Sequence, residues 1–158
     1  MSKTYNQVIE IVTAVAKGHK WIKTVEVGDI TQRENKVEDE YPLCFINYDT
    51  ATVRERTKVY SFGLLVCNQV TTTQSTTSLW NQAQVLSDCE SAITDIINYL
   101  VDIDIKDIKI SFDQQLEPFT NGFLSGAVGW VLNFTIETSY NKNSCDSMIK
   151  DVVLPTYI

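Results

Sequence analysis

The chain has 158 residues, of which 44% are hydrophobic and 21% are charged. A single domain over residues 1–158 with one core is expected, because a domain of this length withdraws roughly 70% of its unfolded surface from water. Twenty acidic residues against 13 basic residues give a net charge of −7, which disfavours a dedicated nucleic-acid binder. No long apolar run and no basic N-terminus followed by an apolar stretch occurs, so neither a membrane span nor secretion is expected, and the protein is predicted to be intracellular.

A first helix is predicted at about residues 5–17. Thr4 and Gln7 match a capping box, in which two side chains satisfy backbone groups that the first helical turn leaves free. Gly18 can adopt the left-handed conformation that ends a helix. The apolar residues at helical spacing between them are Tyr5, Val8, Ile9, Val12, Val15 and Ala16.

Residues 21–27 are rich in β-branched and aromatic side chains, which predicts a strand ending at Gly28 and Asp29. The polar stretch at about 29–42 predicts an exposed loop or arm that ends at Pro42. Its opposite charges suit a contact between subunits, although charge runs are commonly solvated loops, and this alternative stays open. The candidate subunit-contact residues here are Arg33, Glu34, Lys36, Glu38, Asp39 and Glu40.

Two further strands are predicted at 43–48 and 58–67, the second almost continuously apolar. Their polar connection at 49–57 suits a hairpin with a solvated tip, so antiparallel pairing in the centre of a sheet is expected. The Thr-, Ser- and Gln-rich residues 71–78 then lead along the surface to a helix.

The second helix is predicted from an apolar stripe, and it begins either near Ser78 or at a second capping box formed by Ser87 and Glu90. Its apolar positions recur at helical intervals and are expected to face the sheet. They are Leu86, Cys89, Ile93, Ile96, Ile97 and Leu100.

The last third of the chain predicts more strands. A short strand is expected at 108–112, followed by an irregular turn at 115–126 that contains Pro118. Residues 128–136 alternate between apolar and mixed side chains, which predicts a strand with one face on the core and places Trp130 there. The polar loop at 140–147 adds Tyr140 and Lys142 as candidate subunit-contact residues.

Helices and strands do not alternate regularly along the chain, so a doubly wound parallel sheet is not expected. The order predicts an α+β fold, in which a mainly antiparallel sheet packs against two helices.

Chemical motifs are weak, and we expect no enzyme, no cofactor and no metal site. The single histidine, His19, lies between two lysines at a helix end and is interpreted as a solvated boundary residue. The aspartates at 102, 104 and 107 lack the glycine and closing glutamate of a calcium loop. The glycines at 122–129 lead into a strand, whereas phosphate-binding loops lead into a helix.

The four cysteines are far apart in the sequence, without zinc-ligand spacing, and are expected to be reduced. They are Cys44, Cys67, Cys89 and Cys145.

In its organisation the chain resembles the tail-terminator or tail-completion proteins of tailed bacteriophages and related neck, or head–tail joining, subunits. The resemblance covers most of the chain. It rests on the N-terminal helix, the run at 59–66, the helix around 86–90, and the C-terminal hairpin formed by 117–126 and 130–134 and closed at Cys145.

This resemblance implies a non-catalytic virion protein in the tail or neck, assembled in the host cytoplasm. It implies a homo-oligomeric ring, with a hexamer favoured and a dodecamer possible, that contacts other tail, neck or portal-proximal proteins. DNA would pass through the ring without specific binding, and the acidic charge permits this. The alternatives are an intracellular adaptor or regulatory domain and, third, a small enzyme.

Overall fold

The structure is a computed structural model that describes residues 4–32, 40–70, 78–103, 105–120, 127–139 and 153–157. The side chains at 32, 78–80 and 112–114 lie outside this description. The described elements, in chain order, are α1 (Tyr5–Gly18), β1 (Thr24–Gly28), the 3-10 helix η1 (Ile30–Gln32), β2 (Leu43–Val53), β3 (Thr57–Gln69), α2 (Ser78–Asp102), β4 (Ile108–Phe119) and β5 (Ala127–Ser139).

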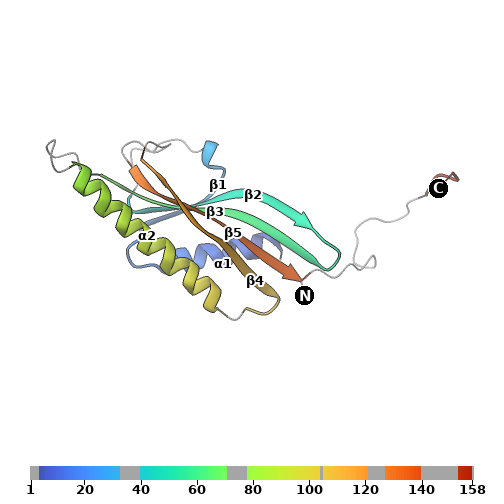
Figure 1. The fold of residues 1–158 in the computed structure, drawn as a ribbon. Helices are drawn as coiled ribbons and strands as arrows, with labels where there is room; N and C mark the ends of the chain where they lie inside the picture. The colour runs from blue at the N-terminus through green and yellow to red at the C-terminus, as the bar shows by residue number, and fades with distance from the viewer. Residues whose placement is uncertain are drawn as a thin grey trace.

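The strands form one sheet in the order β1-β2-β3-β5-β4. All neighbouring strands are antiparallel except β1 and β2, which are parallel. Both helices lie against the same face of this sheet and contact each other (Figure 1). The predicted α+β fold, with a mainly antiparallel sheet packed against two helices, is therefore confirmed.

The first helix begins as its sequence predicts, but Gly18 is its last helical residue and does not adopt the expected left-handed conformation. Thr4 accepts a hydrogen bond from the backbone of Gln7, and the Gln7 side chain accepts one from the backbone of Thr4, which completes the capping box. The residues at helical spacing that become fully buried are Val8, Val12 and Ala16. This spacing directs one face of α1 onto the sheet.

The second helix begins at Ser78 and runs without a break, so the alternative start at Ser87 is wrong. Its predicted apolar stripe is confirmed, because the side chains from Cys89 to Leu100 at these positions are at most 2% exposed. The helix is also joined to β5 by a hydrogen bond of 2.7 Å from Trp130 Nε1 to the Leu86 carbonyl oxygen. Trp130 therefore packs against the core as predicted.

The central strands are longer than predicted. β2 continues to Val53 and β3 starts at Thr57, so the chain turns within 54–56 instead of over the whole of 49–57. The polar Thr52 belongs to β2 because it pairs with Val59 of β3, whereas Asp49 lies at a register shift between Tyr48 and Ala51. The first strand, in contrast, begins only at Thr24, three residues after the predicted start at Trp21.

The predicted turn at 115–126 is wrong in its first part, because β4 continues to Phe119. Pro118 pairs with Trp130 of β5 and does not break the strand. A proline is tolerated here because β4 is an edge strand, where one side of the backbone has no partner in the sheet. Residues 121–126 lie outside the described part of the chain.

The opposite face of the sheet carries a second, smaller apolar cluster at one end. It is formed by Ile30, Leu43, Phe45, Leu65, Cys67 and Ala127. η1 contributes Ile30, whose backbone N–H donates a hydrogen bond of 2.9 Å to Asn47 Oδ1 on β2. The segment after β1 is therefore fixed to the sheet at its start.

Candidate interaction surfaces

A groove lies between α1 and α2. Its volume is about 520 Å³, which is within the range of binding sites for small molecules and peptides. The lining residues are mostly apolar: Ile11, Ala14, Val15, Gly18, His19, Asp95, Ile96, Tyr99 and Ile103. Tyr99, at 61% exposed, forms part of its rim.

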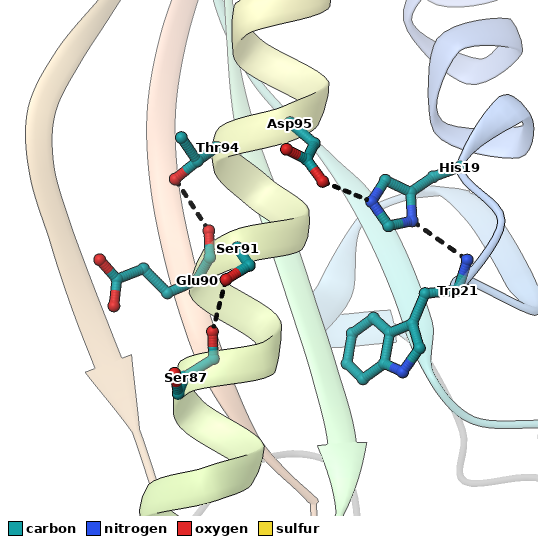
Figure 2. Close-up of polar contacts among 7 residues, drawn as sticks. All are labelled: His19, Trp21, Ser87, Glu90, Ser91, Thr94 and Asp95. Atoms are coloured by element: carbon teal, nitrogen blue, oxygen red, sulfur yellow. Dashed lines mark hydrogen bonds and ion pairs between the residues drawn. The ribbon is translucent and has the colours of Figure 1, made fainter.

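His19 and Asp95 join the two helices across this groove (Figure 2). The backbone N–H of Trp21 donates to Nδ1 of His19 over 3.2 Å, so in the neutral ring the proton is on Nε2. Nε2 lies 3.1 Å from Oδ2 of Asp95 and can donate to it. The prediction of a solvated boundary histidine is wrong, because the side chain is only 17% exposed and both ring nitrogens have partners.

Figure 2 also labels Ser87, Glu90, Ser91 and Thr94, which are exposed polar residues of α2. Ser91 and Thr94 donate their hydroxyl hydrogens to carbonyl oxygens one turn earlier in the helix, over 3.1 and 2.9 Å. Such hydroxyls are satisfied within their own helix. This face is therefore a solvated helix surface, and it holds no group prepared for chemistry.

The outer half of β2 forms an open sheet edge. β1 pairs only with residues from Leu43 to Asn47, so within the described chain no strand covers β2 beyond Asn47 on that side. All residues from Tyr48 to Val53 are exposed, with Tyr48 at 45% and Val53 at 66%. In Figure 1 this part of β2 extends with β3 beyond the end of α1.

An aromatic cluster fixes the base of this open edge to the core. Tyr5 on α1 lies with its ring centroid 6.1 Å from Tyr48, 5.1 Å from Tyr60 and 5.7 Å from Phe62. Burial, and then the neighbouring Tyr48 and Tyr60, raise the pKa of Tyr5. Aromatic pairs at such separations stabilise their packing beyond the area they bury. The edge is therefore held rigidly by α1.

The opposite edge of the sheet, β4, is protected against pairing. A register shift interrupts its pairing with β5 between Phe112 and Leu116, and Pro118 lacks a backbone N–H. Lys109 is exposed on the same strand. Bulges, prolines and lysines are the features by which edge strands avoid pairing with other chains. The outer half of β2 also has a register shift, between Tyr48 and Ala51. It carries no proline and no lysine, so it is the more accessible of the two edges.

Most of the subunit-contact residues proposed from the sequence lie outside the described part of the chain. These are Arg33, Glu34, Lys36, Glu38 and Asp39 in the first segment, and Tyr140 and Lys142 in the second. Glu40 is described and exposed, next to the half-buried Tyr41. The contact role of both segments stays a prediction.

The described cysteines at positions 44, 67 and 89 are buried and form no disulfide, which agrees with the expected reduced state of these three. Cys145 lies outside the described residues. Burial raises the pKa of Cys44 to about 12. The pKa of Cys89 also rises to about 12, through burial first and Asp88 second. Thiols of this kind are poor nucleophiles at neutral pH.

Of the three aspartates near the end of α2, Asp102 is its last residue and Asp107 lies beyond it. Asp104 lies outside the description, and among the described residues no group of three or more His, Cys, Asp or Glu side chains is placed to hold a metal ion. Neither of the two described helices combines the length and apolar character that crossing a membrane requires.

Sequence reasoning missed both the groove and the open edge. The groove residues on α1 include Ile11 and Ala14, which lie beside the buried stripe, and such extra apolar residues were the available signal.

No family model matches this sequence. No curated protein is significantly similar to it.

Proposed function

We propose that this protein is a structural, non-enzymatic subunit that assembles with copies of itself into a ring in the tail or neck of a tailed bacteriophage. The observation that carries the assembly is the open edge of β2 at residues 48–53. The resemblance in sequence organisation supports the place in the virion, where the ring joins or terminates the tail tube.

An open edge of this kind favours association with another protein chain. Its backbone N–H and C=O groups on the free side can pair with a strand of a neighbouring molecule, and exposed side chains such as Tyr48 and Val53 can fill pockets beside it. The aromatic contacts of Tyr5 keep the edge ordered before binding, which lowers the entropic cost of association. The hairpin is therefore prepared for a protein partner.

A ring requires the open edge of β2 to pair with a different surface of the next copy, because such a contact is head-to-tail rather than two-fold symmetric. Head-to-tail contacts close into rings when the rotation between neighbours allows it. The resemblance favours six copies, with twelve as the alternative, and other tail, neck or portal-proximal proteins as neighbours. The net charge of −7 lets DNA pass without strong phosphate contacts.

Lysine substitution at the open edge tests this proposal. Val53→Lys places a charge where a neighbouring strand would pair, while Val101→Lys makes the same change at an exposed position on α2 and serves as the matched control. We expect rings of the wild type and of V101K in negative-stain electron microscopy, and loss of rings for V53K. Rings of V53K equal to those of V101K would exclude the edge as the subunit contact.

The same images separate the proposal from its main alternative. An adaptor domain that binds a different protein would remain a single chain at every concentration. Uniform particles of one-chain size in the wild type would therefore contradict the ring function itself, independently of the lysine variants.

A further inference from the structure

The C-terminal residues 153–157, called the tail below, are apolar and exposed. Val153 is 92% exposed, Leu154 64% and Tyr157 87%. Three large apolar side chains within five residues are costly to leave in water and are typical of a segment that binds another surface. The described part of the chain therefore leaves these three side chains uncovered in this structure.

The groove between α1 and α2 offers the complementary surface. Ile11, Val15 and Ile103 line it with half-buried apolar side chains. At its edge the carboxylate of Asp95 is 67% exposed and already accepts from His19. A carboxylate has further lone pairs, so Asp95 can also accept a hydrogen bond from a backbone N–H or a tyrosine hydroxyl of a bound segment.

The tail and the groove of one chain are separated in this structure. Figure 1 shows the C-terminus far from both helices, on the side to which the β2–β3 hairpin points. The thirteen residues 140–152 that connect β5 to the tail can span at most about 45 Å when fully extended. The tail can therefore contact surfaces up to about that distance from the end of β5 at Ser139.

We propose that the tail of one copy of this chain binds in the α1–α2 groove of the neighbouring copy. Leu154 and Tyr157 enter the apolar part of the groove, and Tyr99 covers them from the rim. This inference rests on the self-assembly in the proposed function, and it adds a second contact to the open edge of β2. Because tail and groove are different surfaces, the contact is head-to-tail and suits ring closure.

A cross-linking experiment between two different variants tests the contact in the full-length protein. All variants carry Cys145→Ser, so that the remaining native thiols described here are buried. Protein with Tyr99→Cys is mixed with separately tagged protein with Leu154→Cys and treated with a short bismaleimide. The matched control replaces Tyr99→Cys by Ala83→Cys, which lies on an exposed part of α2 outside the groove.

We expect the Y99C and L154C proteins to give a cross-linked dimer of the two tagged chains, at a yield at least about tenfold above that of the A83C control. Equal yields in the two mixtures would overturn the proposal. A protein that carries both Y99C and L154C provides a second test. A cross-link that forms only within one chain of this protein would also overturn the proposal, because the tail would then bind its own groove.

Introduction of a negative charge into the groove provides an independent test of the contact. Ala14→Glu introduces a carboxylate into the apolar lining, whereas Ala83→Glu makes the same change on an exposed helix position outside it. We expect A14E to weaken self-association about tenfold or more, as the loss of a buried apolar contact does at protein interfaces, and A83E to leave it unchanged. Sedimentation of these full-length variants over a concentration series measures both values.

The outcomes separate this inference from the proposed function. A wild-type oligomer that shows no tail-to-groove cross-link, and that A14E leaves intact, contradicts the tail contact while the ring remains. A wild-type protein that is monomeric throughout contradicts both.

Discussion

Replacement of Ile97 by alanine should measure how strongly α2 is held to the sheet. Ile97 is 2% exposed and belongs to the main core cluster. The substitution removes three buried carbons at about 0.8 kcal/mol each, and the cavity left behind adds to this loss. We therefore expect the free energy of unfolding to fall by about 3 kcal/mol, which corresponds to a decrease in Tm of roughly 6–12 °C.

The assay is equilibrium unfolding in urea, followed by circular dichroism, at one fixed protein concentration because self-association contributes to apparent stability. Val101→Ala is the control on the same helix, since Val101 is 48% exposed. Its loss should stay within about 0.5 kcal/mol. A loss below about 1 kcal/mol for I97A, with normal folding, would show that the α2 stripe is not packed against the sheet as described.

Three further outcomes are expected. Gly129→Ala should prevent normal folding, seen as loss of the native circular dichroism signal, because a Cβ atom there would lie 2.0 Å from the Val66 carbonyl oxygen; a native-like melting curve would contradict this close packing. Thr4→Ala should lower stability by about 1 kcal/mol in urea unfolding through loss of the capping box, and no change would show that the cap is dispensable. Cys44 and Cys89 should not react with a thiol reagent in native protein below pH 9.0, and rapid labelling at pH 7 would contradict their burial. Because burial raises the pKa of both thiols from 9.0 to about 12, their contribution to the free energy of unfolding should be fully present below pH 9.0. It should be lost as the pH rises from 9.0 towards about 12.

The features that local sequence determines were predictable. The capping box at Thr4 depends on residues three apart, and the α2 stripe depends on a spacing that brings every apolar side chain to one face. The alternation in β5 likewise records which face meets the helices. These patterns were sufficient for the α+β class, because they state which elements exist and which side of each is buried.

The features that depend on pairing were not predictable. Pro118 is usual in a turn, and only its place on the edge strand β4 allows the strand to continue through it. Residues 49–52 have no strand pattern, and β2 continues through them because Ala51 and Thr52 pair with Tyr60 and Val59 of β3 after a register shift. The parallel pairing of β1 with β2 was likewise not predictable, because β-propensity indicates that a strand exists and not its direction in the sheet.

The candidate surfaces were not predictable for the same reason, because they depend on contacts between residues far apart in the sequence. The groove joins Ile11 and Tyr99, which are far apart in the sequence and meet only when both helices pack on one face of the sheet. His19 shows this most clearly, because its partner Asp95 is 76 positions away. A local reading places this histidine in solvent, whereas the fold uses it to connect two helices.

The solution mass of the full-length protein tests the central claim most directly. Native mass spectrometry or sedimentation velocity, over a range of concentrations and at moderate ionic strength, determines the number of chains in each particle. The ring account predicts one closed species of six chains, or twelve as the alternative, with no continuous series of larger assemblies. A single-chain species at every concentration would contradict self-assembly and, with it, the proposed role in a phage tail or neck.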